Sequence, residues 1–439
     1  MGSSIVPAGK SPSEERLESG ARDARAASGK WLPAGGWTFK FGIVCLLGFA
    51  ALNAGMVWQV RESIAKGYGD FASFYTAGQI VRSGQSARLY DPGLQWKIQQ
   101  HFASKVKIRQ GPFPYVRPPF ESLLFLTFAY LSYPVACGLW MVLQIALLLA
   151  VPIVLFPVLG QGFDLRTYAV EVLGCLAFFP VGFCLVQGQD SVLLLLILSV
   201  ALGFLVRGAE LRTGAVLGLG LFKFHLVIPL IAILLLQRKW RAGVGFAAVG
   251  VVLVGISLMM VGWGGLLIYP KYLWELNQAP GLGMVKPPSM PNVRGLLTAF
   301  SAGGMLSSPA NWFLAGLFVA GVIFASLSWR GAGRTAKTAG FSSWIAVTLA
   351  TSYYANSYDL TLLLIPLLLL GKKFWGSGEF FGWPRILFLG SASLLLCTPL
   401  LWGLAVPEGL FRWVGIVVLG LAISIPAAEK YRRQIAESD

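Results

Sequence analysis

The sequence predicts an all-α polytopic membrane protein, and three observations support this class. The chain of 439 residues is 56% hydrophobic and only 12% charged, whereas a soluble protein of ordinary composition carries about a quarter charged residues. Apolar runs of about 15 to 24 residues recur along it, which is the length that crosses the hydrocarbon core as a helix. These runs lack the alternating pattern of barrel strands, so a helical bundle is the architecture that satisfies the backbone in lipid.

The apolar runs predict a bundle of about 10–12 transmembrane helices with two outer loops. We expect the transmembrane domain at residues 38–428, between a disordered cytoplasmic tail (1–37) and a cytoplasmic C-terminal tail (429–439). The first outer loop is residues 61–119 and the second is residues 263–294. The expected spans are residues 38–60, 120–133, 134–156, 168–186, 191–206, 215–236, 244–262, 311–327, 341–352, 360–370, 386–404 and 413–425.

The net charge of +16 lies largely in short segments between apolar runs. Positive charge on the cytoplasmic side explains this placement, so we expect no nucleic-acid partner. An even number of crossings puts both termini inside and the first loop on the outer side of a bacterial inner membrane. Residues 207–214 do not fit this topology, because it places their arginines on the outer side, where the positive-inside rule does not favour them. The sequence leaves open whether 215–236 is one span or a re-entrant hairpin broken near Lys223 and Pro229.

Cysteine and histidine usage predicts no metal site and no cofactor. The five cysteines lie in apolar stretches without a CxxC pair, which is typical of small buried core residues. His101 and His225 are the two histidines, too few for a histidine-based zinc site.

The first outer loop gathers a carboxylate, aromatics and cations at a membrane face. Apolar spacing predicts helices lying on the membrane surface at residues 70–83 and 94–106. Asp70 precedes the first of these, where a carboxylate is either a helix cap or a general base kept basic by partial desolvation. Asp91, directly before Pro92, is the weaker candidate because Asp-Pro is common turn chemistry.

Several cations and polar breaks are the other candidates. Arg117 precedes Pro118, where it either snorkels to the interface or holds an anionic phosphate with its planar fork. Lys223 and His225 lie midway in an apolar run, where ionisable groups are costly and a functional role is the default hypothesis unless the run is a hairpin with Lys223 near its tip. Gln189 and Asp359 lie in polar breaks that turn formation alone also explains.

These pieces, taken in order, resemble glycosyltransferase family 87, whose members are polyprenyl-phosphate-sugar-dependent enzymes of the GT-C superfamily. The ordered set runs from about Gly69 to Pro366. Its elements are Asp70-Phe71-x-x-Phe74-Tyr75-x-Ala77-Gly78, Leu89-Tyr90-Asp91, Tyr115-x-x-Pro118-Pro119-Phe120, Gly188-Gln189-Asp190, Gly218-Leu219 followed by Lys223, the basic turn 238–241, Ser352-Tyr353-Tyr354 and Tyr358-Asp359-Leu360.

The resemblance implies an inverting hexosyltransferase that uses a polyprenyl-phosphate sugar, with mannose the leading sugar, and a lipid or glycan acceptor at the outer membrane face. It implies Asp70 as the general base, with Arg117, Lys223 and Arg294 as candidates to neutralise the leaving phosphate. Neither metal nor cofactor is required. The full set of substrate-binding candidates is Tyr75, Tyr90, Asp91, Tyr115, Arg117, Gln189, Lys223, His225, Asn292, Arg294, Tyr358 and Asp359.

Two departures leave the acceptor and the sugar open: the family often has Lys-Pro where this chain has Lys223-Phe224, and Ser-Pro where it has Ser352-Tyr353. Some members also place histidine near the position of Tyr358 or Asp359. Two other functional classes stay open. A transporter or flippase would use Lys223 and His225 along a through-path, and a polysaccharide ligase would place its main outer loop late in the chain.

Overall fold

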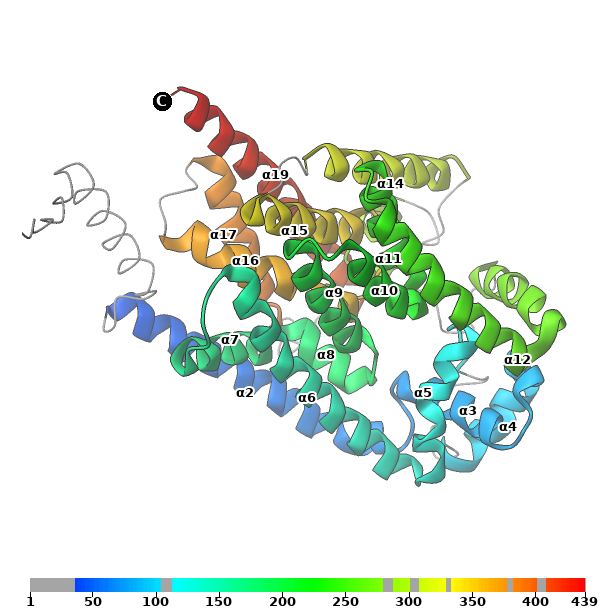
Figure 1. Ribbon diagram of the computed structural model, residues 1–439. Helices are drawn as coiled ribbons and strands as arrows, with labels where there is room; N and C mark the ends of the chain where they lie inside the picture. Colours follow the sequence, from blue (N-terminus) through cyan, green and yellow to red (C-terminus); the bar gives the residue numbers. More distant parts are fainter. Residues whose placement is uncertain are drawn as a thin grey trace, which may run out of the picture. The chain divides into compact units, whose positions relative to one another are not determined.

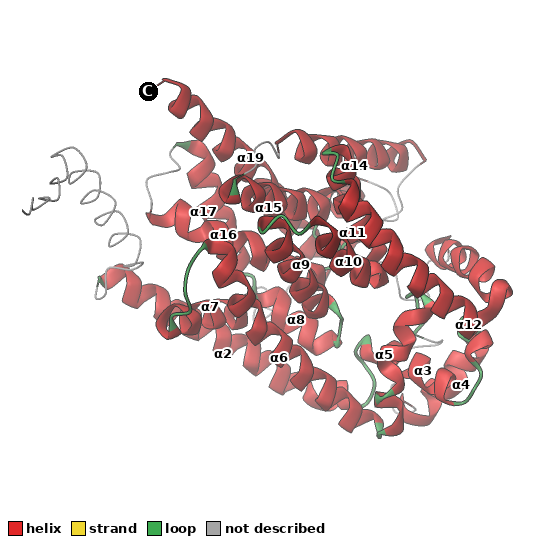
Figure 2. Ribbon diagram, viewed as in Figure 1, coloured by secondary structure: helices red, strands yellow, loops and turns green. Residues whose placement is uncertain are grey.

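The computed structural model describes residues 36–103, 113–278, 287–300, 308–328, 333–376, 382–400 and 408–438. All regular secondary structure in these ranges is helical, so the predicted all-α class is confirmed (Figure 2). The chain divides into two compact units, Met1–Gly48 and Phe49–Asp439. The expected N-terminal tail lies outside the described residues apart from its last two.

The helices follow one another with short connections. Their bounds are α2 (Trp37–Ala65), α3 (Phe71–Arg82), α4 (Pro92–Ala103), α5 (Ser122–Leu126), α6 (Tyr133–Leu159), α7 (Leu165–Ala177), α8 (Phe179–Gln187), α9 (Ser191–Val206), α10 (Glu210–Leu219), α11 (Phe224–Leu236), α12 (Trp240–Gln278), α13 (Val293–Leu297), α14 (Ser308–Ser328), α15 (Arg334–Thr351), α16 (Leu364–Gly376), α17 (Trp383–Leu396) and α19 (Val414–Ser438). The 3-10 turns used below are η1 (Ser86–Arg88), η2 (Pro119–Glu121), η3 (Phe128–Tyr130), η4 (Gly220–Lys223) and η8 (Ser357–Leu363).

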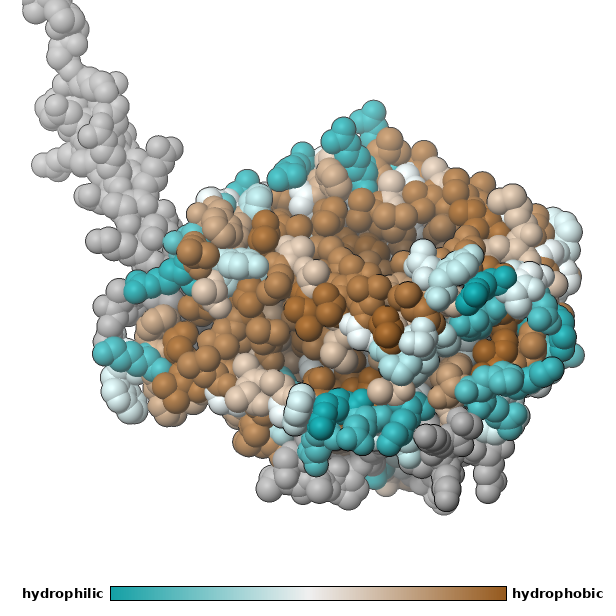
Figure 3. Space-filling view, turned by 90° about the horizontal axis from the view of Figure 1, so that it is seen from below, coloured by the Kyte–Doolittle hydropathy of each residue, from teal (hydrophilic) through white to brown (hydrophobic). Residues whose placement is uncertain are grey.

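Six helical runs within the described ranges are long and apolar enough to cross a membrane, or seven if the bent pair α7 and α8 counts as one span. Three shorter apolar helices accompany them, at Ser191–Val206, Ser357–Gly371 and Trp383–Leu396. A broad apolar surface with hydrophilic residues along its border is visible in Figure 3. On α12, Val251, Val254 and Met259 are exposed apolar side chains of the kind that lipid covers.

The open question about residues 215–236 has a definite answer in the structure. Glu210–Leu236 forms one 27-residue candidate span that contains α10, the single 3-10 turn η4 and α11. The alternative of a re-entrant hairpin is therefore wrong. By contrast, α7 and α8 meet at an angle of 62°, because Pro180 at the start of α8 cannot continue the ladder of hydrogen bonds from α7.

Two expectations about the first outer region are corrected. Residues 120–133 do not form a span, since they are divided among η2, α5 and η3 before α6 begins, and a five-residue helix is far too short to cross. The helix expected at 70–83 is present as α3 but does not lie on a surface, because nine of its twelve residues are buried. A Cβ on Gly78 would lie 2.4 Å from the Phe125 carbonyl oxygen, so glycine is what permits α3 to pack this closely on α5.

The segment that contains α3, α4 and α5 lies beside α12 (Figure 1). Its aromatic side chains form a compact cluster. Phe71 and Phe74 of α3 stack on or pack edge-on against Phe125, and Trp140 of α6 lies 5.0 Å from Phe125 between ring centroids. Rings packed in this way contribute energy beyond the area that they bury. This packing fixes the first turn of α3, and with it the position of Asp70.

Candidate active site

A tight turn between α8 and α9 brings the middle of the sequence to the start of α3. Gly188 ends α8 with a φ of +65°, and a Cβ there would lie 2.6 Å from the Phe71 Cβ. The indole nitrogen of Trp140 donates to the Gly188 carbonyl at 2.9 Å and holds the turn from its other side. Gln189, which follows this turn, is therefore placed next to Asp70, which directly precedes Phe71.

Asp70 is half-buried and is linked by side-chain hydrogen bonds to groups far away in the sequence. The Gln189 amide nitrogen donates to its Oδ2. The amide oxygen of Gln189 accepts from Nη2 of Arg117 at 3.0 Å, and the same nitrogen donates to Oδ1 of Asp190 at 2.9 Å. We call the series Asp70, Gln189, Arg117 and Asp190 the Asp70 chain. It orients the Asp70 carboxylate through neutral and charged donors.

The Asp70 chain ends in a buried ion cluster, which we define as Arg117, Asp190, Lys223 and Asp359. The Lys223 ammonium lies 2.9 Å from Oδ1 of Asp190 and 2.6 Å from Oδ1 of Asp359. Ser191 accepts from Lys223 and donates to Asp359 at 3.1 Å. Two cations face two carboxylates, and all four side chains are nearly inaccessible to solvent. Buried charges persist when they are paired and hydrogen-bonded in this way.

A fifth ionisable group, Glu121, lies against this cluster with its Oε2 3.8 Å from Nε of Arg117. Burial raises the pKa of Glu121 well above its usual range, and the charge of Asp190 adds to that effect. Burial would raise the pKa of Asp190 as well, but Arg117 and Lys223 outweigh it and lower the value to about 2. The two neighbouring carboxyl groups therefore have pKa values shifted in opposite directions, and the two cations of the cluster are matched by its two aspartates.

The segment from Ser352 to Asp359 connects this cluster with Asn292 and Arg294. Asn356 and Asp359 cap η8 reciprocally, and the Asn356 amide donates to the Tyr358 hydroxyl at 2.6 Å. Burial raises the pKa of Tyr354, and the nearby Asp70 carboxylate raises it further. Asp70 thus lies close to this segment as well as to Gln189.

His225 and the two second-loop candidates contact the same segment. His225 packs edge-on against Tyr354 with 6.0 Å between ring centroids. The Asn292 amide donates to the Ser352 carbonyl at 2.9 Å, and the Arg294 guanidinium lies 3.7 Å from the ring centroid of Tyr353. His225, Asn292 and Arg294 are therefore gathered on the segment from Ser352 to Asp359, where Tyr354 lies near Asp70.

The three candidate cations differ in how their charge is matched. Arg117 and Lys223 each have carboxylate partners in the buried ion cluster. Arg294 forms hydrogen bonds only with the carbonyl and hydroxyl of Tyr353, and the part of the chain that the structure describes supplies no carboxylate to it. Its Nε is buried and has no hydrogen-bond partner in those ranges. Arg294 is therefore the candidate with an unmatched charge.

The remaining candidates of the first loop make structural contacts. The hydroxyls of Tyr90 and Tyr115 donate to the carbonyls of Arg117 and Pro118, which fixes the segment that carries Arg117. The Tyr75 hydroxyl donates to the Leu131 carbonyl at 2.7 Å, away from Asp70.

The Asp91 carboxylate likewise makes structural contacts. Its carboxylate accepts from the backbone nitrogens of Gly93 and Leu94 and pairs with Arg88 at 2.6 Å. The hydrogen bond from Arg88 is the largest cause that lowers the pKa of Asp91. These contacts all lie within three residues, which fits the turn chemistry that the sequence indicated for Asp91.

Three members of the site were not on the list of candidates, namely Glu121, Asp190 and Ser191. Glu121 had a usable signal, because a carboxylate inside an apolar stretch is costly for the same reason that singled out Lys223. Asp190 was missed because it lies in a polar break, Gly188-Gln189-Asp190, that turn formation alone also explains. As for metals, no group of three or more potential ligands lies together within the described ranges.

The model of glycosyltransferase family 87 matches residues 115–353, which includes Arg117, Gln189, Asp190 and Lys223. Neither a curated protein nor a solved structure matches the chain. Asp70 and Asp359 lie outside the matched range, so their place in the site comes from the contacts described above. The match covers more than half of the sequence, and the chain is therefore a member of glycosyltransferase family 87, a family of membrane glycosyltransferases.

Proposed function

We propose that this protein transfers a hexose, with mannose as the first sugar to test, from a polyprenyl-phosphate donor to a lipid or glycan acceptor at the outer face of a bacterial inner membrane. The observation that carries the proposal is the half-buried Asp70 carboxylate at the end of the Asp70 chain. A carboxylate that is oriented by hydrogen bonds and partly accessible to substrate is suited to general-base catalysis.

In the proposed reaction, Asp70 accepts the proton of the acceptor hydroxyl as its oxygen attacks the anomeric carbon. A new carbon–oxygen bond forms on the face opposite the donor phosphate. The bond from the anomeric carbon to the phosphate oxygen breaks, and polyprenyl phosphate leaves with the electron pair. This single displacement inverts the anomeric configuration.

Arg294 is the residue that we assign to the departing phosphate. Negative charge increases on that oxygen in the transition state, and a cation already in place stabilises it. Arg117 and Lys223 serve the site differently: their charges are matched by Asp190 and Asp359, so they support Asp70 and η8 rather than the donor. His225, next to Tyr354, and Gln189 complete the residues closest to the reacting groups.

The experiment compares purified wild-type protein in lipid with Asp70→Asn, using radiolabelled polyprenyl-phosphate-mannose and a membrane-lipid extract as the source of acceptor. We expect Asp70→Asn to lose at least about 100-fold in rate, because a general base contributes roughly 10²–10⁴-fold. Asp91→Asn is the matched control, since it removes a carboxylate from the same loop that is engaged in capping α4. Equal rates in wild type and Asp70→Asn would refute the assignment of the base.

The transporter alternative makes the opposite prediction for the same variants. Movement of a labelled lipid-linked sugar across the bilayer should then survive Asp70→Asn and depend on Lys223. The contacts of Lys223 favour the enzyme, because an ammonium fixed between two carboxylates and 1% exposed is poorly placed to line a path for substrate.

A further inference from the structure

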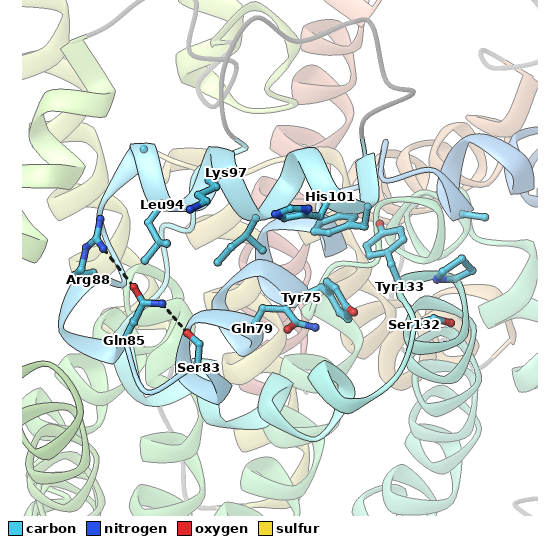
Figure 4. A pocket seen from close by; sticks show the side chains of 15 residues that line it. Tyr75, Gln79, Ser83, Gln85, Arg88, Leu94, Lys97, His101, Ser132 and Tyr133 are labelled. Atoms are coloured by element: carbon cyan, nitrogen blue, oxygen red, sulfur yellow. Dashed lines mark hydrogen bonds between the residues drawn. The ribbon is translucent and has the colours of Figure 1, made fainter.

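A concave site lies between α3 and α4 (Figure 4). The cavity has a volume of about 750 Å³, which is in the range of small-molecule sites. Tyr75, Gln79 and Ser83 line one wall, spaced four residues apart along one face of α3. Lys97 and His101, four residues apart on α4, line the opposite wall. We call this site the α3–α4 groove.

The groove is distinct from the candidate active site. Asp70 is not among its lining residues. Tyr75 follows Asp70 by five positions, which corresponds to a rotation of about 140° around a helix of 3.6 residues per turn. The Tyr75 side chain also points to the Leu131 carbonyl, whereas Asp70 is bonded to Gln189. A ligand in the groove would therefore lie on a different face of α3 from the Asp70 carboxylate.

The lining of the groove carries unmatched positive charge. Its basic members are Arg88, Lys97 and His101, and the lining includes no acidic side chain. Arg88 is already paired with Asp91 and bonded to Gln85. Lys97 and His101 are exposed and have neither an ion pair nor a hydrogen bond with any residue in the described ranges. An anionic group is the ligand chemistry that fits the α4 wall.

The rest of the lining fits a polyol rather than a bare anion. Amides and hydroxyls of Gln79, Ser83 and Gln85 lie along the α3 side, where they can hydrogen-bond hydroxyl groups of a ligand. At the other end, Phe102 stacks on Tyr133 with 4.5 Å between ring centroids, and Tyr75 packs edge-on against Tyr133 at 5.3 Å. These rings provide an apolar wall with polar edges, which suits the carbon face of a polyol.

The position of the groove indicates where such a ligand comes from. Ser132 and Pro134 line it, and α6, which begins at Tyr133, is a 27-residue candidate membrane span. Val135, Leu139 and Val142 on the first turns of α6 are exposed apolar side chains that suit contact with acyl chains. The groove therefore opens where a span leaves the bilayer, at the depth of lipid headgroups.

We infer that the α3–α4 groove binds the phosphate-bearing polyol headgroup of a membrane lipid, with Lys97 and His101 on the phosphate and the amides and rings on the polyol. This is a binding site separate from the proposed chemistry at Asp70. It does not depend on which sugar the enzyme transfers.

The test measures binding without turnover. The full chain, purified in a neutral detergent, is titrated with dihexanoyl phosphatidylglycerol, with glycerol 3-phosphate and with dihexanoyl phosphatidylcholine. We expect phosphatidylglycerol to bind, and the double variant Lys97→Gln/His101→Gln to weaken it by about tenfold or more, since a charge-assisted contact of Lys97 and a ring N–H donor of His101 are lost. Arg61→Gln/Lys271→Gln is the matched control, because it removes two exposed cations that do not line the groove and should leave the affinity unchanged.

Each other outcome overturns part or all of the inference. Equal binding of phosphatidylcholine, or an affinity that the Lys97/His101 variant leaves unchanged, would overturn the site. Binding of glycerol 3-phosphate as tight as that of the lipid would retain a phosphate–polyol site but overturn its assignment to membrane lipid. Both substituted side chains are exposed, so the variants should fold, and an unchanged melting temperature verifies this.

Discussion

Replacing Lys223 with methionine tests whether the buried ion cluster is formed as described. Met is similar in length to Lys and fills the same space, so the main change is the loss of one positive charge between two carboxylates. The ammonium lies 2.6 Å from Asp359 and 2.9 Å from Asp190. With an effective dielectric constant of about 20, each attraction is worth about 6 kcal/mol before desolvation is subtracted.

The cost of desolvating the charges cancels much of this attraction, so the measured loss is smaller than the sum. Removing one partner of a buried pair typically destabilises by about 3–5 kcal/mol, because it leaves an uncompensated charge. We expect that loss for Lys223→Met. The double variant Lys223→Met/Asp359→Asn should lose less than the sum of the two single variants, with a coupling of at least about 1 kcal/mol.

The assay is equilibrium unfolding in mixed micelles, in which added dodecyl sulfate unfolds the helices and circular dichroism follows their loss. Lys271→Met is the matched control, because Lys271 pairs with Glu275 at 3.8 Å on an exposed surface, where such pairs contribute about 0–1 kcal/mol. An unfolding midpoint for Lys223→Met equal to that of wild type would refute the cluster, as would losses for Lys223→Met and Asp359→Asn that simply add.

Three further predictions concern the cluster and the groups next to it. The folded-state pKa of Asp190, about 2, lies below its unfolded value. The ionised carboxylate therefore stabilises the fold above roughly pH 4, and this stabilisation disappears as the pH falls toward 2. Unfolding free energies measured from pH 2 to 6 should show a larger acid-induced loss in wild type than in Asp190→Asn. Burial raises the pKa of Glu121, so the stability of the protein falls as the pH rises above the usual glutamate range. Glu121→Gln should be at least as stable as wild type at pH 8. A loss of several kcal/mol in this variant would contradict the raised pKa. Gly188→Ala should lower the free energy of unfolding by about 2 kcal/mol and reduce transferase activity. The added Cβ would contact Phe71, and the backbone at this position has a φ that L residues avoid. An unchanged melting temperature would show that the turn does not need glycine.

Local signals in the sequence were sufficient for the helices and insufficient for the contacts between them. Ser191–Val206 was predicted with the bounds that α9 has, because an uninterrupted apolar run between two polar breaks defines both ends. The span expected at residues 120–133 failed for a reason visible only in three dimensions: α5 ends after five residues where it packs against Gly78 of α3. A run of apolar letters does not distinguish contact with lipid from contact with another helix.

The candidate site shows the same limit more clearly. Lys223 was singled out because an ammonium in an apolar run needs a partner. Its partner Asp190 lies 33 positions earlier in the chain and its partner Asp359 lies 136 positions later. No spacing rule relates these three residues. Asp70 was singled out by its place in the first loop, but its hydrogen bond to Gln189 bridges 119 positions. Tertiary packing decides which candidates meet, and it placed Tyr75 and Asp91 elsewhere.

Charge balance is what separates the roles of the site residues. The resemblance to known transferases nominated Arg117, Lys223 and Arg294 alike for the donor phosphate. If all three had been unmatched, the site would carry strong positive charge and bind a phosphate firmly even after transfer, which would slow its release. With Arg117 and Lys223 matched by Asp190 and Asp359, the cluster instead supplies rigidity to Gln189 and through it to Asp70. In the proposed reaction, Arg294 faces the developing charge, and its Nε has no hydrogen-bond partner within the described ranges. The electrostatic balance that keeps the interior neutral would then also leave the leaving group free to depart.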